Sequence, residues 1–296
     1  MILKRACYDT AMRWTLGALG AAWLLAGACR REPAHRTEKP VPETYRWANC
    51  PGDRSPGDAL PALIKDGDAV FFVGNSFLGW QDRVLPDWVA ALGRAVTPPI
   101  RIETGADILP GNTPLGGFLG HPATQAALAS RKYKLFVLQA EEYEPVDRKP
   151  AFHQAVREFN RAITAAGGRT VLFLTWEFPW RRFLDQLAAS YDEIGRELGI
   201  PVIPVGLVYR DSARAPFPHE SPFWLTADSG HPQGDLHENE KGSAVNAYAT
   251  FALLTGRNPL GKSFTAPGNT NSEALMRYLS DIAWNRVRPR LEAGCR

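Results

Sequence analysis

The chain has little net charge, few cysteines and no internal repeat. Its 34 Lys and Arg residues exceed its 31 Asp and Glu residues by only three, and the first 28 residues supply two of these three charges. The remainder therefore carries 31 basic and 30 acidic side chains. A nearly neutral protein offers no electrostatic reason to expect binding to nucleic acid or to an anionic membrane surface.

The chain also lacks a hydrophobic run as long as the roughly 20 residues that span a bilayer. Residues 14–28 are apolar and uncharged, but they number only fifteen, follow basic residues and end in Ala26-Gly27-Ala28. This pattern is typical of a secretory signal peptide, so we predict a signal over residues 1–28 and an exported protein. Residues 29–60 are rich in Pro, Arg, Glu and Gly and predict a flexible tether, which leaves one domain over residues 61–296.

The four cysteines are Cys7, Cys29, Cys50 and Cys295. The segment that ends at Cys29 reads Leu-Ala-Gly-Ala-Cys and resembles the lipobox of bacterial lipoproteins, with Ala26 where Leu is usual. The resemblance implies lipidation of Cys29 and attachment to a membrane through this lipid alone; plain cleavage after Ala28 is the alternative. Cys50 and Cys295 then remain in an oxidising compartment, either as a disulfide or as two unpaired surface thiols.

Beyond the tether, apolar strands alternate with amphipathic helices. Strands are predicted over residues 69–73, 100–103, 135–138, 170–174 and 201–205, and helices over residues 88–96, 124–130, 152–166, 183–198, 243–255 and 272–291. Continuous apolar strands that alternate with helices indicate an α/β fold, with a parallel sheet covered on both faces. Ligands of such sheets bind at the carboxyl ends of the strands, so the loops that follow the strands are where a site is expected.

The first of these loops reads Gly74-Asn75-Ser76-Phe77 and directly follows the most apolar strand. Glycine permits a tight turn, which would place the Ser76 hydroxyl at the carboxyl end of the strand. The G-x-S-x-G pattern of nucleophile-elbow hydrolases is absent, because Leu78 stands two residues after Ser76. Gly-Asn-Ser alone is also a common turn, and Ser76 could merely cap a helix.

A second polar segment, residues 235–243, precedes the predicted helix near the C-terminus and contains Asp235 and His237. A serine hydrolase needs a base that is hydrogen-bonded to its nucleophile and an acid that orients the base. His237 and Asp235 supply both groups, although a solvated polar loop would have a similar composition.

These two segments together resemble the SGNH (GDSL-like) hydrolases. In that family a G-D/N-S block follows the first strand, and a D-x-x-H block near the C-terminus is followed by a glycine and an Ala-rich helix. Gly74-Asn75-Ser76-Phe77 is similar to the first block, and His237 with Gly242 five residues later is similar to the last. The resemblance covers about residues 68–259. It implies a three-layer flavodoxin-like fold with a five-stranded parallel sheet, and a serine ester hydrolase that needs no metal or cofactor.

The resemblance also implies an oxyanion hole, the group of donors that binds the negative oxygen of the reaction intermediate. The corresponding positions are the backbone of Ser76, a glycine at Gly116-Gly117 and an Asn after the third strand. This chain has Gln139 at the last position. An amide can still donate there, and capping of the strand is the alternative role.

The acid departs from the family pattern as well. Gly234 stands three residues before His237, where D-x-x-H requires Asp, and Asp235 stands two residues before it. Asp228 and His231 match D-x-x-H literally, but Leu236 stands five residues after His231, where the family has Gly. We therefore favour His237 as the base and Asp235 as the acid, with His231 and Asp228 as alternates.

Three other functions compete with the esterase. A metal site would use the acidic and His residues His231, Asp235, His237, Glu238 and Glu240, whose spacing matches no compact metal motif. A carboxylate-pair hydrolase would use two of Glu141, Glu142 and Glu144. A non-catalytic binding lipoprotein on the same fold is the third. Aromatic residues of the same loops, namely Trp80, Trp176, Phe178 and Trp180, could line a small-molecule or carbohydrate ester site or simply pack. The oligomeric state cannot be inferred from the sequence.

Overall fold

The structure is a computed structural model that describes residues 60–214, 221–230, 234 and 236–294. The predicted signal over residues 1–28 and the tether up to residue 59 lie outside the described residues. So do Cys29, Cys50, Cys295, His231 and Asp235, and the predictions made for them are untested. Within the described residues, no helix combines the length and the apolar character that crossing a membrane requires.

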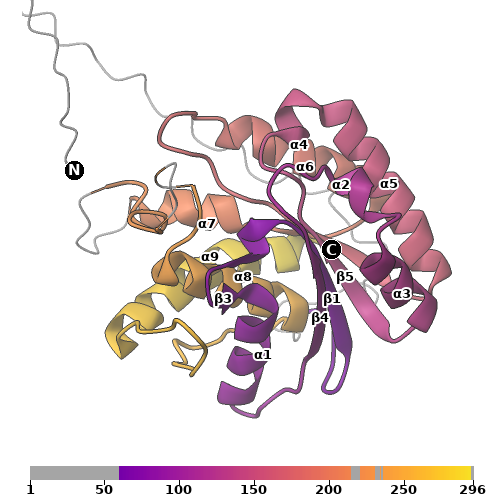
Figure 1. Ribbon diagram of the computed structural model, residues 1–296. Helices are drawn as coiled ribbons and strands as arrows, with labels where there is room; N and C mark the ends of the chain where they lie inside the picture. The colour runs from indigo at the N-terminus through magenta and orange to yellow at the C-terminus, as the bar shows by residue number, and fades with distance from the viewer. Residues whose placement is uncertain (1–59, 215–220, 231–233, 235, 295–296) are drawn as a thin grey trace, which may run out of the picture. The chain divides into compact units, whose positions relative to one another are not determined.

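The described residues form a parallel sheet with helices on both faces, which confirms the predicted fold class (Figure 1). Its strands are β1 (Ala69–Gly74), β4 (Glu103–Ile108), β5 (Tyr133–Leu138), β6 (Arg169–Phe173) and β7 (Val202–Ile203). They run in the order β4-β1-β5-β6-β7, and each neighbouring pair is parallel. This is the flavodoxin-like order, in which ligands bind where the strand order reverses, between β1 and β5.

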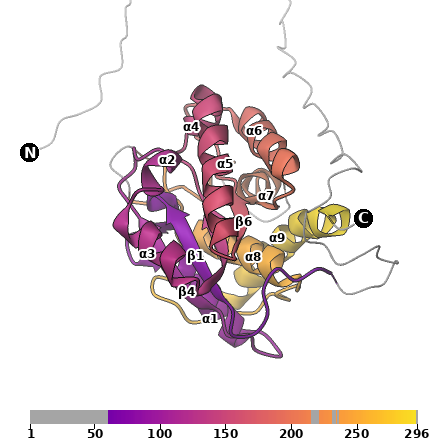
Figure 2. The same cartoon turned by 90° about the vertical axis from the view of Figure 1, so that its right-hand side faces the viewer.

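The helices form the two outer layers (Figures 1 and 2). They are α1 (Leu85–Ala95), α2 (Leu115–Phe118), α3 (Pro122–Ser130), α4 (Glu144–Asp147), α5 (Lys149–Ala165), α6 (Leu184–Leu198), α7 (Val205–Ser212), α8 (Glu240–Thr255) and α9 (Glu273–Gly294). Helices α1 and α8 pack together on one face, with α9 against α8, whereas α3 and α5 cover the other face. Helix α8 is buried on nearly all sides, which explains its uniformly apolar sequence.

Apolar patterning located four of the five strands, but the second lies further along the chain than predicted. We predicted residues 100–103, whereas β4 begins at Glu103 and ends at Ile108. Ile100 and Ile102 are buried ahead of the strand, where the Ile100 N–H donates to the Gly93 carbonyl of α1. Strand β4 is an edge strand, so most of its side chains are partly exposed and its sequence lacks the continuous apolar run of a central strand.

Candidate active site

The loop after β1 is a tight turn into a short 3-10 helix, η1 (Ser76–Leu78). Asn75 caps this helix, because its Oδ1 accepts the Phe77 N–H at 3.1 Å. Gly74 is required for close packing, since an added Cβ would overlap the side chains of Gln139 and Leu78. Ser76 therefore stands at the carboxyl end of β1, as predicted from the sequence.

The structure brings Ser76 and His237 together. The His237 Nε2 atom lies 2.6 Å from the Ser76 Oγ atom, although 161 residues separate the two positions. His237 is only 3% exposed and belongs to the loop that enters α8. A neutral imidazole at this distance accepts the serine hydroxyl proton, which is the arrangement of a nucleophile and its general base.

The loop that carries His237 is anchored by Asn239. Its side-chain oxygen accepts the N–H groups of Lys241 and Gly242 at 3.0 and 3.1 Å, and so caps α8. Its amide nitrogen donates to the carbonyls of Trp224 and Ala227, each at 2.8 Å. One buried amide thus joins the start of α8 to the preceding loop and fixes the chain two residues after His237.

Two aromatic rings enclose the imidazole of His237. The Trp80 indole stacks on it, with ring centroids 4.0 Å apart and an interplanar angle of 10°, and Phe77 meets it edge-on at 5.3 Å. Trp80 belongs to a small hairpin of β2 (Gly79–Trp80) and β3 (Arg83–Val84), and its Nε1 donates to the Ser229 carbonyl at 2.9 Å. The imidazole is therefore oriented by packing as well as by its hydrogen bond to Ser76.

Asn75 connects the serine turn to two other loops. Its backbone N–H donates to Gln139 Oε1 at 2.7 Å, and its side-chain Nδ2 donates to the Gly111 carbonyl at 3.1 Å and to Glu142 Oε2 at 3.4 Å. Asn75 itself is 1% exposed. The turn is thus fixed by hydrogen bonds to the loops that follow β4 and β5. Sequence reasoning missed this role of Asn75, for which its polarity was the available signal.

Gln139 and Gly117, the two predicted auxiliary oxyanion donors, donate their hydrogen bonds to carbonyl groups of the protein. Gln139 is buried beneath the turn, where its Oε1 accepts the Asn75 N–H and its Nε2 donates to the Ala140 carbonyl. Gly117 lies inside α2, and its N–H donates to the Pro114 carbonyl at 2.9 Å. By contrast, the Ser76 N–H makes no hydrogen bond to another described residue, which leaves it available to a ligand.

The three glutamates after β5 differ in their partners. Glu141 is paired with Arg148 at 2.6 Å, and the buried Glu144 accepts the Leu115 N–H at 2.8 Å. Both carboxylates therefore have structural partners. Glu142 is closest to the serine turn, and burial raises the pKa of its carboxyl despite the opposing hydrogen bond from Asn75.

For the acid, the structure describes only one of the two candidates. Asp228 occupies the left-handed region, with φ of 54°, in the loop whose Ser229 carbonyl accepts the Trp80 N–H. Asp235 and the alternate base His231 are outside the described residues. Among the residues that are described, no three His, Cys, Asp or Glu side chains are grouped as metal ligands.

The aromatic side chains of the loops differ sharply in exposure. Phe178 is 0% exposed and Trp176 is 1% exposed, whereas Trp180 is 51% exposed. Trp176 is held by its Nε1, which donates to the Leu236 carbonyl at 3.1 Å, and by stacking on Tyr209. Trp176 and Phe178 are therefore packing residues, and only Trp180 of this group presents a large surface to solvent.

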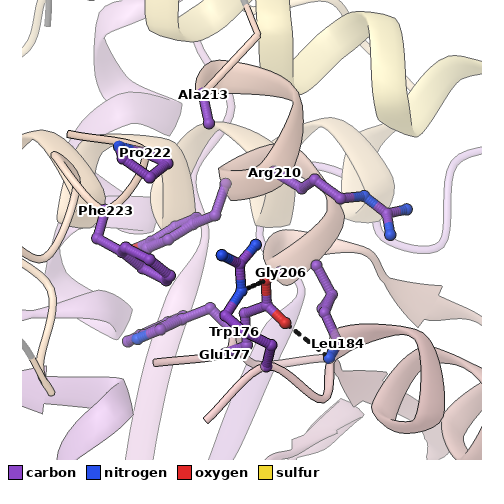
Figure 3. A pocket seen from close by; sticks show the side chains of 10 residues that line it. Trp176, Glu177, Leu184, Gly206, Arg210, Ala213, Pro222 and Phe223 are labelled. Atoms are coloured by element: carbon purple, nitrogen blue, oxygen red, sulfur yellow. Dashed lines mark hydrogen bonds and ion pairs between the residues drawn. The ribbon is translucent and has the colours of Figure 1, made fainter. Parts of the chain in front are cut away.

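A separate pocket is lined by Trp176 together with residues of α7 and of the loops that follow β6 and α7 (Figure 3). Its walls include Glu177 and Arg182, which form an ion pair at 2.7 Å, and the side chain of Phe223. Glu177 also accepts the Leu184 N–H at 3.0 Å. Neither Ser76 nor His237 lines this pocket, so it is not the site of the serine–histidine pair.

No protein-family model matches the chain, and no curated protein sequence matches it. Solved structures do resemble it. A DUF4886 family protein from Bacteroides uniformis aligns with a TM-score of 0.59 and 16% identity, over 74% of this chain and 94% of the other. An acetylxylan esterase from Geobacillus stearothermophilus aligns with a TM-score of 0.50 and 15% identity, over 64% and 94%.

A candidate SGNH hydrolase from Slackia heliotrinireducens aligns with a TM-score of 0.49 and 21% identity, over 63% of this chain and 98% of the other. At these identities the likeness concerns the fold. The chain therefore shares the α/β fold of these solved structures, a parallel sheet covered by helices on both faces.

Proposed function

We propose that the chain is a serine ester hydrolase in which Ser76 is the nucleophile and His237 is the general base. The observation that carries the proposal is the 2.6 Å distance between His237 Nε2 and Ser76 Oγ at the carboxyl end of β1. The stacking of Trp80 on His237 supports it, because a base must be held in one orientation to act on its nucleophile.

In the proposed reaction the Ser76 Oγ attacks the ester carbonyl carbon while its proton passes to His237 Nε2. The carbonyl oxygen becomes negative and is bound by the Ser76 N–H. The tetrahedral intermediate then expels the alcohol, which takes the proton from His237, and leaves the acyl group on Ser76. Water, deprotonated by His237, attacks this acyl-enzyme and releases the acid together with the free serine.

The acid that orients His237 is proposed to be Asp235, with Asp228 as the alternate. Because Gln139 and Gly117 donate to protein carbonyls, the proposed oxyanion hole relies on the Ser76 N–H. One donor is typically responsible for about 10²–10³-fold in turnover. With the Ser76 N–H as the donor identified among the described residues, the proposal predicts slow turnover.

The test is labelling of the purified protein with a fluorophosphonate probe, together with turnover of p-nitrophenyl acetate. Ser76→Ala should abolish both, and His237→Ala should lower turnover by at least about 10²-fold. Ser190→Ala is the matched control, because buried Ser190 Oγ lies 3.2 Å from His153 Nε2 and forms a serine–histidine pair between α5 and α6. This control should leave labelling and turnover unchanged.

A folded wild-type protein that neither labels nor turns over the ester would contradict the proposal and favour the binding lipoprotein. Persistence of labelling in Ser76→Ala would contradict the assignment of the nucleophile alone. Circular dichroism and thermal unfolding of each variant separate these outcomes from loss of the fold.

We also propose that the protein is exported and anchored through a lipid on Cys29. The support is the sequence of residues 1–29 alone. Mass spectrometry of the protein from membranes tests it: a lipidated N-terminal Cys29 is expected, and a mature chain that begins at Cys29 without lipid would indicate plain cleavage after Ala28. The same experiment without reductant reports whether Cys50 and Cys295 are joined.

A further inference from the structure

Trp180 lies at the tip of a tight hairpin that follows β6. The N–H of Phe178 donates to the Arg181 carbonyl and the N–H of Arg181 donates to the Phe178 carbonyl, each at 3.2 Å. Only Pro179 and Trp180 lie between these two residues. The hairpin therefore projects one large aromatic side chain, which is 51% exposed, from a closed backbone turn.

The exposed indole is held in place on one face and at its nitrogen. One face stacks on Phe178, with centroids 5.2 Å apart and an interplanar angle of 15°, and Nε1 lies 3.3 Å from the Tyr143 hydroxyl to which it donates. The Arg181 guanidinium donates two hydrogen bonds to the Asp147 carboxylate, which hold the hairpin in place. Its Cζ atom lies 4.7 Å from the centroid of the Tyr143 ring. A side chain that is fixed before binding loses little entropy when a ligand is bound.

Two separate series of side-chain contacts connect the hairpin to the candidate active site. Phe178, under the indole, contacts the ring of Phe77 at 6.1 Å, and Phe77 is the residue after the proposed nucleophile. Tyr143, which accepts the indole N–H, is the residue after Glu142, whose carboxylate accepts the Asn75 amide. The hairpin and the serine turn thus share Phe178 as a common neighbour, and both follow the carboxyl ends of strands of the same sheet.

The surroundings of the indole favour a sugar ring over a lipid chain. A lipid chain requires a contiguous apolar surface, but Phe178 beneath the indole is buried and Tyr143 is partly buried. The exposed Pro179 precedes Trp180, and the charged pair of Arg181 and Asp147 follows it, so no wide apolar surface surrounds the indole. A sugar ring has one face of C–H groups, which stacks on an aromatic ring, and hydroxyls at its edge. The hydroxyls can bond to carboxylate and guanidinium groups such as this half-exposed pair.

We propose that Trp180 forms a carbohydrate subsite, in which the ring stacks on a sugar unit of an ester-bearing oligosaccharide or polysaccharide. This inference rests on the proposed ester hydrolysis at Ser76 and assigns its substrate class. Binding energy from a sugar held away from the reacting ester raises kcat/KM only for substrates that extend to the subsite. Small aryl esters, which cannot reach Trp180, should not depend on it.

The kinetic test compares acetylated xylo-oligosaccharides with p-nitrophenyl acetate for the wild type, Trp180→Ala and Trp180→Tyr. Trp180→Ala should lower kcat/KM about tenfold on the oligosaccharide, equivalent to about 1.4 kcal/mol, and leave the aryl ester unchanged. Trp180→Tyr should recover most of the loss. Leu260→Ala is the control, because Leu260 is the other large hydrophobic residue exposed in the described part of the chain, at 69%. Leu260→Ala should leave kcat/KM unchanged on both substrates.

A binding test separates failure of the subsite from failure of the proposed chemistry. Calorimetric titration of Ser76→Ala with xylohexaose, cellohexaose and chitohexaose should show binding of at least one sugar, which Trp180→Ala in the same background removes. Aryl-ester turnover without such binding, or equal losses on both substrates, would overturn the subsite and leave the esterase intact. Sugar binding without any turnover would overturn the esterase and keep the subsite as a carbohydrate-binding site.

Discussion

Replacement of Asn75 by aspartate tests how the serine turn is held. The introduced carboxyl group has nearly the size of the amide, and it can still accept the Phe77 N–H that caps η1. It cannot donate when ionised, so the bonds to the Gly111 carbonyl and to Glu142 are lost. Asn75→Asp thus removes the two connections to other loops and leaves the cap itself.

The loss of folding stability in Asn75→Asp can be estimated from those two contacts. Each lost hydrogen bond contributes about 1 kcal/mol, and a buried carbonyl that loses its donor costs about 1–3 kcal/mol. Two carboxylates at the 3.4 Å now separating the Asn75 amide from Glu142 would repel by about 5 kcal/mol at an effective dielectric constant of about 20. Since the pair can keep one proton instead, we expect a total loss of about 2–4 kcal/mol at pH about 8.

The loss of stability in Asn75→Asp should grow as the pH rises. Burial already raises the Glu142 pKa above its ordinary value of 4.5, and the Asn75 hydrogen bond opposes this. Removing that bond and adding a like charge raises the Glu142 pKa further, so the folded variant holds a proton that the unfolded chain releases. Stability is then retained below about pH 4.5 and lost as pH rises through the folded pKa, and the deficit should be smaller at pH about 5 than at pH about 8.

Urea unfolding of the wild type and Asn75→Asp at both pH values measures the deficit, provided that the m-value is unchanged. Asn160→Asp is the matched control, since the Asn160 side-chain oxygen accepts the Thr170 hydroxyl and aspartate preserves that bond. The role assigned to Asn75 would be refuted if Asn75→Asp lowered the free energy of unfolding by less than about 1 kcal/mol at the higher pH. An equal loss at both pH values would refute it as well.

Three further substitutions have defined outcomes. Trp80→Leu should lower kcat/KM on p-nitrophenyl acetate about tenfold with little change in melting temperature, because it removes the ring stacked on His237; unchanged kinetics would show that the stack does not orient the base. Burial raises the Glu238 pKa well above 4.5, so wild-type stability should fall as pH rises from that value, and Glu238→Gln should flatten the fall in urea titrations. Gly206→Ala should destabilise by at least about 1–3 kcal/mol in thermal unfolding, because the added methyl overlaps the Thr175 carbonyl.

Glycine substitutions are compared with Gly120→Ala, where an added methyl meets no atom within 4 Å. This variant should retain the stability of the wild type. If Gly120→Ala and Gly206→Ala destabilised the protein equally, the close approach of α7 to the end of β6 would not be the cause.

Much of the fold could be predicted because its signals are local. Strand β1 is buried along its whole length, and Gly199 and Gly256 end their helices in the left-handed conformation that favours glycine, with φ of 62° and 64°. Strand β4 was misplaced because only the buried side of an edge strand must be apolar, and its most deeply buried residue is Asp107. Asp107 accepts hydrogen bonds from Thr124 at the start of α3, which no periodicity in the sequence indicates.

The side-chain contacts of the site could be predicted only where they follow from the ends of strands. Ser76 follows β1 and His237 precedes α8, so both were expected in loops at the carboxyl edge of the sheet, where they meet. The stack of Trp80 on His237 depends on a two-residue hairpin strand, which is too short to leave a pattern. For Gln139 the position at the strand end was correct, but the direction of its amide depends on a backbone N–H 64 residues away in the chain.

The proposed nucleophile, Ser76, and the proposed base, His237, are held in place by different parts of the molecule. Hydrogen bonds from Asn75 fix the serine turn to the loops after β4 and β5, whereas the His237 loop is fixed by Asn239 at the start of α8 and by the Trp80 hairpin. The two supports meet at the Ser76–His237 hydrogen bond and at Phe77, which contacts the His237 ring. Changes in one support should therefore misalign the pair without unfolding the other. For this reason, the losses of turnover caused by Asn75→Asp and Trp80→Leu should combine less than additively, since either one alone already displaces the same hydrogen bond.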